Sequence, residues 1–446
     1  MVLDMTTMTI KGGTLVSASG ESRGDVLIDD GRIVAVGDVE SRGDVVDASR
    51  QLVMPGMVDT HVHLMDPGET EREDFPSGTR AAAARGITTI VEHTHSHPIR
   101  SREDLLEKQD HLKSRANVDY GLAAHVWPDR IDQIAALSEA GVSFFKIFTC
   151  DTHGVPGLDQ EVLRTALEAI AGVDGRCLIH NEDEGLISKA EKRLRAANRI
   201  DPALLGEWRS RDAELMAVTG SSEVVLETGA VATFAHVSTP GVLDVIDVYR
   251  ALGADIAAEA CPQYFALNEG EVEEHGPLRK FTPPARIRNE RERTAMWAAV
   301  QQGRFSHFST DHAPSTIRQK SAGSFWDAPF GLPGLDTTLP FLIDAALNGQ
   351  ITMSDLVRLY ATAPAQRYLL PKGVIGEGQD ADIVLIDPAG SWPIRDEDIL
   401  SKAGWSPYSG RTLRGRIVAT YLRGEEIARD GECHDLRSGR FVSPIL

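Results

Sequence analysis

Residues 143–183, SFFKIFTCDTHGVPGLDQEVLRTALEAIAGVDGRCLIHNED, contain one complete unit of the pattern that fills the middle of the chain. The apolar run SFFKIFTC predicts a strand, the Ala/Leu/Glu-rich run DQEVLRTALEAIAGV a helix, and RCLIHNED a second strand. Similar units repeat from about Gly56 to Leu369. A strand–helix–strand unit implies parallel strands, and roughly seven or eight of them favour a closed TIM-type (β/α)8 barrel over an open α/β sheet.

Both ends of the chain have a different sequence pattern from the middle. Residues 1–55 and 370–446 alternate Val and Ile with polar residues around Asp-Gly turns, as in GDVLIDDGRIVAVGD and RGRIVATYLRGEEIARDGE. This alternation is typical of antiparallel strands. We therefore expect a small discontinuous β-sandwich domain built from 1–55 and 370–446, packed against a barrel of residues 56–369.

The 446-residue chain is acidic, with 46 Lys and Arg against 66 Asp and Glu and a formal net charge of −20. Such a surface repels nucleic-acid phosphates and anionic lipid, so we expect neither nucleic acid nor a membrane as a partner. The four cysteines have no C-x-x-C spacing, which argues against a zinc finger or a disulfide framework. Because the sequence also has no basic start followed by a long apolar run, it predicts a cytoplasmic protein.

Residues that ionise or bind metals stand at the ends of the predicted barrel strands: His61, His63, Lys146, His180, His236 and Asp311. Barrel enzymes place their chemistry at this rim. His61 and His63 lie two apart on one strand, so both imidazoles share a face and can reach one metal ion. Taken singly, each residue has a structural explanation: a hydrogen-bonded core histidine, a lysine that snorkels to the rim, an aspartate that caps a turn. Their joint occurrence in this order favours a metal site.

These motifs resemble the amidohydrolase superfamily, and within it the cyclic amidases: allantoinases, hydantoinases or dihydropyrimidinases, and dihydroorotases. The resemblance runs over nearly the whole chain, through PGMVDTHVHLMDPG, the FFKIF lysine, IHNED, AHVS, CPQYF, TPPARIR, STDHAP and GEGQDADIVLIDP. It implies a hydrolase with two divalent metal ions, usually zinc, that opens the ring of a small cyclic amide. Tetramers are usual among the relatives, so the resemblance also implies a homotetramer.

The resemblance implies a role for each rim residue. His61, His63 and Asp311 would hold the first metal, His180 and His236 the second, and N6-carboxylated Lys146 would bridge the two. Carboxylation would turn a costly buried cation into an anionic oxygen ligand. Asp311 would take the proton from the attacking hydroxide and pass it to the leaving ring nitrogen. Imidazole and carboxylate ligands suit zinc, manganese or iron alike.

The expected substrate is a cyclic ureide or imide of the allantoin or hydantoin type. Dihydroorotases that resemble this chain carry an Arg where this sequence has Met65, and an Asn in the loop that here reads EHTHSHP. The bidentate clamp for a carboxylate is therefore missing from its usual place, which disfavours dihydroorotate. Another cyclic amide, such as a lactam, a dicarboximide or a dihydropyrimidine, is the alternative. A metal-free scaffold protein is disfavoured because all the ligand positions are present.

Further residues are candidates for substrate contact: His95, Asp151, His153, Gln263, Thr282 and Arg286. His95 belongs to an unusual cluster with His93 and His97, of which we expect at least one to face the pocket. The segment TCDTHGVPG places two of the candidates on a loop that can act as a movable lid. The segment TPPARIR places two more where backbone groups can pair with a ring amide.

Three more polar residues near the rim have structural explanations. We expect Asp336 or Thr337 to cap the helix that follows them. We expect His312 to orient the Asp311 carboxylate rather than to bind a metal ion.

Overall fold

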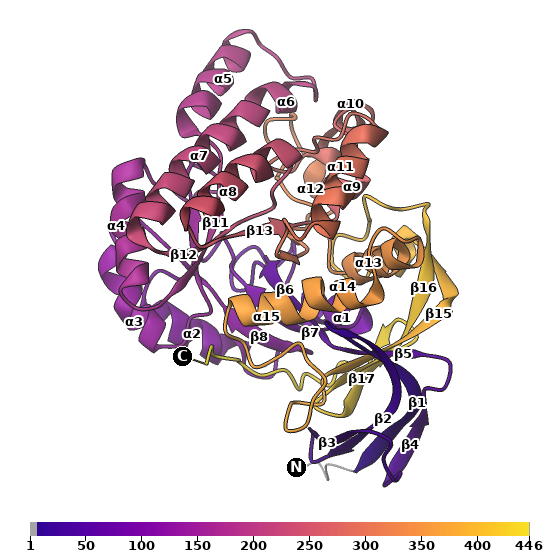
Figure 1. Ribbon diagram of the computed structural model, residues 1–446. Coiled ribbons are helices and arrows are strands. Elements are labelled where there is room, and N and C mark those ends of the chain that lie inside the picture. Colours follow the sequence, from indigo (N-terminus) through magenta and orange to yellow (C-terminus); the bar gives the residue numbers. More distant parts are fainter. Residues whose placement is uncertain (1–6, 446) are drawn as a thin grey trace.

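The computed structural model describes residues 7–445, and parallel strands form a closed barrel at its centre (Figure 1). In chain order the strands are β6 (Met57–Val62), β7 (Ile87–Glu92), β8 (Asp119–Leu122), β9 (Ala124–His125), β10 (Phe145–Phe148), β11 (Arg176–His180), β12 (Val231–Phe234), β13 (Ile256–Ala260) and β14 (His307–Phe308). Neighbouring strands pair in parallel as β6-β7-β8 and as β9 to β14 in sequence order. The predicted TIM-type fold is confirmed.

Two connections close these sheets into one ring. Ala123 alone separates β8 from β9, so one continuous segment pairs with β7 on one side and with β10 on the other. At the opposite seam Val62 bridges in parallel with His312. The backbone N–H of His63 also donates to the carbonyl of His312 at 2.8 Å. The segment that follows β14 therefore lies beside the end of β6, as a closed barrel requires.

Helices cover the outside of the barrel between successive strands (Figure 1). They are α1 (Phe75–Ala84), α2 (Arg102–Leu112), α3 (Ile134–Glu139), α4 (Gln160–Ala171), α5 (Glu184–Ala196), α6 (Leu204–Trp208), α7 (Arg211–Thr228), α8 (Pro240–Leu252), α9 (Gln263–Ala266), α10 (Glu271–His275), α11 (Glu290–Gln301), α12 (Ile317–Lys320), α13 (Thr338–Leu347), α14 (Met353–Val357) and α15 (Ala363–Arg367). Helix α4 shows why they form: Asp159 caps its N-terminus, and Leu163, Ala166, Leu167 and Ile170 bury one face at helical spacing. No helix within residues 7–445 is long and apolar enough to cross a membrane.

Side chains fill the inside of the barrel in layers. The floor of the site is an apolar cluster that includes Val91, Ala123, Phe144 and Leu178. Residues two further along a strand point to the same side of the sheet. The next layer therefore consists of His93, His125, Lys146 and His180. The strand period places these ionisable groups directly above an apolar floor.

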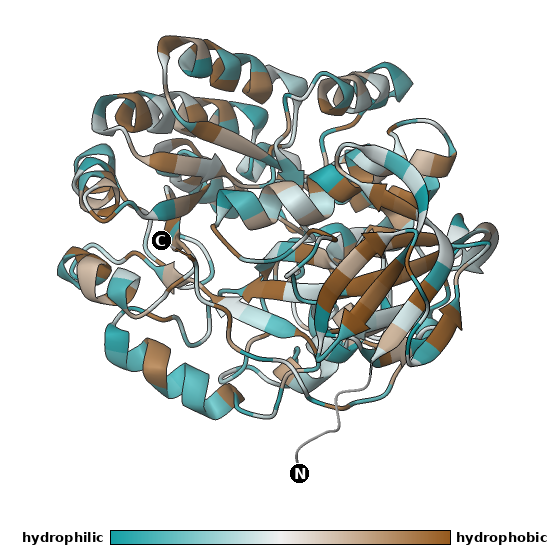
Figure 2. Cartoon of the chain, turned by 60° about the horizontal axis from the view of Figure 1, so that its bottom comes forward, coloured by the Kyte–Doolittle hydropathy of each residue, from teal (hydrophilic) through white to brown (hydrophobic). Residues whose placement is uncertain are grey.

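Strands from the N-terminal segment and from the C-terminal segment form one nine-stranded sheet (Figures 1 and 2). Its strands are β1 (Met8–Ser17), β2 (Gly20–Asp29), β3 (Arg32–Gly37), β4 (Asp44–Asp47), β5 (Leu52–Pro55), β15 (Ile383–Pro393), β16 (Thr412–Leu422), β17 (Glu425–Arg429) and β18 (Glu432–Cys433). The antiparallel pair β5–β15 joins the N-terminal strands to the C-terminal ones. Hydrophobic residues from both ends share one core, which includes Ile10, Val26, Ile383 and Leu385. The limits 1–55, 56–369 and 370–446 stay predictions, and residues 1–6 and 446 lie outside the described part.

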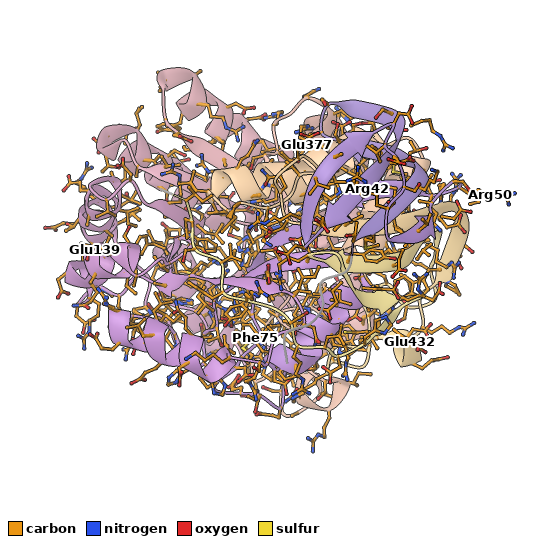
Figure 3. The ribbon with its side chains drawn as sticks, turned by 90° about the horizontal axis from the view of Figure 1, so that it is seen from below. Arg42, Arg50, Phe75, Glu139, Glu377 and Glu432 are labelled. Atoms are coloured by element: carbon orange, nitrogen blue, oxygen red, sulfur yellow. The ribbon has the colours of Figure 1, made fainter. Side chains whose placement is uncertain are left out.

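A buried ion cluster connects the terminal sheet to the barrel. The Lys372 ammonium lies 2.6 Å from Asp119 of β8, 2.8 Å from Asp380 and 2.7 Å from Asp382. The guanidinium of Arg423 also pairs with Asp119. Most other charges lie outside, as with Arg50 and Glu139, while Phe75 lies within the core (Figure 3).

Candidate metal centre

A small pocket of about 20 Å³ opens at the carboxyl ends of the barrel strands. It is lined by His61, His63, His95, Lys146, Phe148, His153, His180, His236, Thr282, Asp311, Ala313, Phe330 and Gly331. All the ligand residues predicted from the sequence line this one pocket. Three of the predicted substrate contacts, His95, His153 and Thr282, line it too.

The H-x-H pair and Asp311 form one side of the pocket. The Nε2 atoms of His61 and His63 lie 3.2 Å and 3.6 Å from Oδ1 of Asp311. Each imidazole is held from behind at Nδ1, since His61 contacts Glu259 at 2.8 Å and His63 contacts the carbonyl of His93 at 2.6 Å. With Nδ1 of each ring engaged, Nε2 is the nitrogen left to bind a metal ion.

His180 and His236 form the other side. Nδ1 of His180 lies 3.0 Å from Nε2 of His236. Nε2 of His180 lies 2.8 Å from Oε2 of Glu182, and that same oxygen accepts from Arg209 at 3.0 Å and from Thr282 at 2.6 Å. Two nitrogens that share a tetrahedral zinc lie about 3.3 Å apart, given bonds of about 2.0–2.1 Å. The pair is spaced to hold one metal ion.

Lys146 lies between these two sides. Its side chain is 1% exposed, and its amine lies 3.5 Å from Nε2 of His61. Burial lowers the pKa of Lys146 to about 8, because an ammonium is poorly solvated there, although the nearby carboxylates of Glu259 and Asp311 oppose this shift. About a tenth of the amine is therefore neutral at pH 7, and the neutral amine is the form that reacts with carbon dioxide.

Burial sets the protonation of the whole site. It lowers the pKa of His61, His63 and His236 well below the ordinary value, so these imidazoles are neutral and can act as ligands. Burial raises the pKa of Asp311 well above its usual range, although the nearby Lys146 opposes this shift. His236 and Asp311 have left-handed backbones, with φ of 36° and 49°. Strain of this kind is typical of functional positions.

A second, larger cavity of about 700 Å³ adjoins the pocket. His153 and Phe330 line both spaces and separate them. Trp127 and Trp208 give the cavity aromatic walls, and Asp151 lies on its rim. The two spaces therefore share a wall, and the larger one is called the vestibule below.

Three predicted substrate contacts do not line the metal pocket. Asp151 is exposed, lies in the vestibule and accepts from the backbone of Gly157 at 2.7 Å. The guanidinium of Arg286 is buried and donates to the carbonyl of Arg209 at 2.7 Å, so it supports the site from outside. Gln263 is buried in α9. Direct contact of these three residues with substrate stays a prediction.

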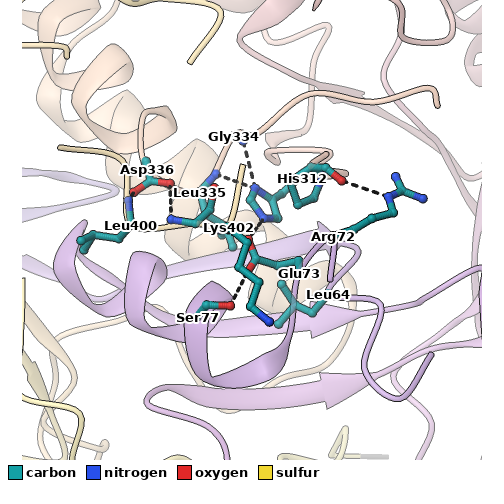
Figure 4. Close-up of polar contacts among 12 residues, drawn as sticks. Leu64, Arg72, Glu73, Ser77, His312, Gly334, Leu335, Asp336, Leu400 and Lys402 are labelled. Atoms are coloured by element: carbon teal, nitrogen blue, oxygen red, sulfur yellow. Dashed lines mark hydrogen bonds and ion pairs between the residues drawn. The ribbon is translucent and has the colours of Figure 1, made fainter. Parts of the chain in front are cut away.

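His312 does not orient Asp311, and that prediction is wrong. Its Nδ1 accepts from the backbone N–H groups of Gly334 at 3.0 Å and Leu335 at 3.2 Å (Figure 4). Its Nε2 then carries the proton and faces Glu73, 3.5 Å away. His312 therefore fixes the loop that precedes α13.

Neither Asp336 nor Thr337 caps the helix through its side chain, and that prediction is also wrong. Its carboxylate accepts from the backbone N–H groups of Leu400 at 2.8 Å and Ser401 at 3.3 Å (Figure 4). The residue before α13 is Thr337, which makes no side-chain cap. Asp336 instead attaches the C-terminal segment to the barrel rim.

Sequence reasoning missed two carboxylates that position the ligands. Glu182 holds His180, as described above. Glu259, at the end of β13, contacts His61 and also accepts from the backbone of His236 at 3.0 Å. Both residues are 0% exposed. A signal was present in the sequence, because each acid stands at a strand end, in IHNED and in AEACPQ.

Within residues 7–445 three buried or half-buried groups have the composition of a cation site: His61 with His63 and His93; Cys150 with His180 and Glu182; and Asp119 with Asp380 and Asp382. The Lys372 ammonium fills the third group. The Arg209 guanidinium contacts Cys150 and Glu182 of the second. The first contains the H-x-H pair, and the amine of Lys146 lies 3.5 Å from Nε2 of its His61.

Comparison with known proteins identifies the family. Residues 52–427 match the amidohydrolase family. An allantoinase from Rubrobacter xylanophilus is 33% identical over 446 residues, covering 98% of this chain and 97% of the relative. A dihydroorotase from Halobacterium salinarum is 34% identical over 431 residues, covering 96% of this chain and 98% of the relative. A solved structure, L-hydantoinase (dihydropyrimidinase) from Arthrobacter aurescens, has a TM-score of 0.93 at 28% identity and covers 98% of this chain and 100% of that one. The chain thus belongs to the amidohydrolase family.

Proposed function

We propose that this protein uses two divalent metal ions to hydrolyse the ring amide of a cyclic ureide or imide of the allantoin or hydantoin type. The observation that carries the proposal is the single buried pocket lined by His61, His63, Lys146, His180, His236 and Asp311. The allantoinase and L-hydantoinase relatives support the same class of substrate. The protein is then a cyclic amidohydrolase.

The proposed ligands fit the metal chemistry. His61, His63 and Asp311 would hold the first ion, and His180 and His236 would hold the second. Lys146, carboxylated on Nζ, would bridge them; its lowered pKa of about 8 supports this assignment. Neutral imidazoles and carboxylates suit zinc. When bound, two metal ions of this kind polarise the scissile carbonyl and lower the pKa of water.

Asp311 moves the proton. It lies within 4 Å of both H-x-H imidazoles, at 3.2 Å and 3.6 Å, and its side chain is 12% exposed. Burial raises its pKa, so it can accept a proton from the attacking water and release it in the next step. The acceptor of that second transfer is the leaving ring nitrogen, which departs as a neutral amide or amine. One aspartate therefore serves as base and then as acid.

The pocket walls favour an uncharged ring. Its lining contains imidazoles, Thr282 and aromatic side chains, and no arginine. His95 and His153 stack with ring centroids 4.4 Å apart and face the pocket. We propose that His95 and His153 donate hydrogen bonds to ring carbonyls and that the Thr282 hydroxyl, whose proton goes to Glu182, accepts from a ring N–H, while the vestibule near Asp151 receives the ring substituent.

Dihydroorotate is the second candidate, because the dihydroorotase relative is as similar as the allantoinase. Against it stands Met65, which is fully buried and accepts a hydrogen bond from Thr94 at 3.5 Å. A thioether in this place cannot grip a carboxylate. Lactams, dicarboximides and dihydropyrimidines remain further alternatives. We also propose that the protein is a homotetramer, as the resemblance implies. We propose a cytoplasmic location, as expected from the sequence.

The test is ring opening by the zinc-loaded protein of allantoin, hydantoin, dihydrouracil, dihydroorotate and succinimide, one at a time. The proposal expects turnover of allantoin or hydantoin at the highest kcat/KM. Preferred turnover of dihydroorotate contradicts the substrate assignment while leaving the ring-opening chemistry in place. Failure on every ring by protein that holds its metal contradicts the substrate class as a whole.

A further inference from the structure

We infer that His93 is an additional ligand of the first metal ion, so that three imidazoles, His61, His63 and His93, and Asp311 surround it. The inference rests on the proposed function, since it needs a metal at the H-x-H pair. It adds a ligand to the set inferred from the family motifs and changes the chemistry of that ion.

The strand register directs His93 into the site. Val62 pairs with Glu92 between β6 and β7, so His63 and His93 follow side by side on neighbouring strands. The backbone N–H of His93 donates to the carbonyl of Val62 at 3.0 Å. His93 also stands two residues after Val91 of the apolar floor. Because strand side chains repeat every two residues, His93 points into the barrel in the same layer as Lys146.

The distances suit a shared ion. His61, His63 and His93 each offer one ligand nitrogen, and these nitrogens lie within 4.8 Å of one another. The ring centroids are 5.3 Å apart for His61 and His63, 4.8 Å for His61 and His93, and 4.4 Å for His63 and His93. Imidazoles bound to one ion through bonds of about 2.0–2.1 Å place their centroids about 4.5–5.5 Å apart. Small adjustments of the rings complete the site.

The nitrogens of His93 have no other use. Its side chain is 1% exposed, and among the described residues neither Nδ1 nor Nε2 has a hydrogen-bond partner. Buried polar atoms are nearly always paired, because an unpaired one costs about 1–3 kcal/mol. The rings of His61 and His63 are held at Nδ1, so their Nε2 atoms face the pocket beside Asp311. A metal ion there would bind both of these nitrogens and one nitrogen of His93.

A third imidazole changes which divalent metal ions the first site binds most tightly. Nitrogen-rich sites bind the later first-row divalent ions, such as cobalt, nickel and zinc, in preference to magnesium or manganese. We therefore expect the first site to retain zinc or cobalt more tightly than a two-imidazole site does.

His125 provides a matched control. It is 2% exposed, neither of its ring nitrogens has a partner among the described residues, and it stands in the same layer one strand further on. Its ring centroid lies 5.9 Å from that of His93, and it is not part of the three-histidine group. Replacing His125 removes a buried, unpaired imidazole that packs beside His93 but is not itself a proposed ligand.

The experiment compares metal binding by wild type, His93→Leu, His93→Asp and His125→Leu, each first stripped with a chelator. Cobalt titration followed by visible absorption gives both the stoichiometry and the ligand field. We expect His93→Leu to weaken one of the two cobalt sites by at least 10-fold and to change its spectrum, and His93→Asp to restore part of the affinity. His125→Leu should bind like wild type.

X-ray absorption on the wild-type zinc protein provides a second readout that does not depend on the folding of a variant. It should report more imidazole ligands per ion than the four histidines of the family motifs supply. Unchanged cobalt affinity and spectrum in His93→Leu overturn this inference alone, because wild type still binds two ions. A wild-type protein that binds no cobalt overturns the proposed function together with it.

Discussion

Nδ1 of His180 lies 3.0 Å from Nε2 of His236, so two ring nitrogens from neighbouring strands face each other in the buried pocket. Burial lowers the pKa of both rings, which makes them neutral. Glu182 accepts the N–H of His180 at Nε2, and this bond leaves Nδ1 with its lone pair toward His236. In the proposed second metal site, a carboxylate outside the ligand set therefore orients one of the ligands.

Glu182→Gln tests this orienting role. The amide keeps the shape but removes the charge that holds Nε2–H of His180 and the Arg209 guanidinium. We expect affinity for one of the two metal ions to fall by about 10–100-fold, measured by competition with a chelator. Glu168→Gln, at an exposed position of α4, is the control. Wild-type affinity in Glu182→Gln rules out the positioning role.

Asp311→Asn tests the proton shuttle. An amide cannot accept and return the proton, so we expect kcat to fall by about 10²–10⁴ while metal content stays near that of wild type. The measurement is steady-state ring opening with metal analysis of the same sample. Asp129→Asn, on an exposed loop, should be fully active. Activity near wild type in Asp311→Asn removes Asp311 from the mechanism.

Lys146→Ala tests the bridge between the two ions. We expect loss of activity and of metal, because in the proposed site the carboxylated side chain would supply an oxygen to each ion. Short carboxylates such as acetate should restore part of the rate, since they can occupy the emptied space. Full metal content together with a full rate in Lys146→Ala would show that no bridge exists there.

Asp66 makes the stability of the fold depend on pH under acidic conditions. Its carboxylate accepts from Arg115 and from His111, each at 2.7 Å. Burial by itself raises the pKa of Asp66, but these donors hold it below its usual value. A carboxyl group with a lowered folded pKa stabilises the fold above its unfolded pKa of about 3.9, and that contribution is lost as pH falls through the folded pKa.

We therefore expect Asp66→Asn to lower the thermal midpoint at pH 7, with the difference from wild type shrinking below about pH 4. Thermal melts between pH 3 and pH 7 measure this, with exposed Asp110→Asn as the control. A difference that grows toward acid pH would contradict the assignment.

Lys372→Met tests the junction between barrel and terminal sheet. The substitution leaves Asp119, Asp380 and Asp382 without their shared cation. Removing one partner from a buried ion cluster costs about 3–5 kcal/mol, so the denaturant midpoint should fall accordingly. Lys189→Met, at an exposed position of α5, should have little effect. An unchanged midpoint would show that the cluster adds nothing to stability.

The barrel, and the gathering of the proposed metal ligands in one pocket, could be predicted from the sequence because barrel enzymes carry their reactive residues at strand ends. Each of His61, Lys146 and Asp311 follows a short apolar run, and period-two alternation fixes which side chain points inward. For His93 the alternation predicted only that at least one histidine of its cluster faces the pocket. Sequence spacing does not show that the strand with His93 lies beside the strand with His61 and His63.

The hydrogen-bond partners of polar residues could not be predicted from the sequence in the same way. His312 stands beside Asp311 in the chain, yet its ring contacts Gly334 and Leu335. Asp336 precedes a helix, yet it binds the backbone of Leu400. Both contacts join segments that are distant in the chain, and local sequence carries no information on such pairs.

The most direct test of the central claim is reconstitution of metal-stripped protein with zinc in the presence of bicarbonate, followed by ring opening of allantoin and hydantoin. We predict no turnover in the stripped protein and a rate that rises with zinc until about two ions are bound per chain. Ring opening that persists without metal, or full metal binding with no ring opening, would contradict the account.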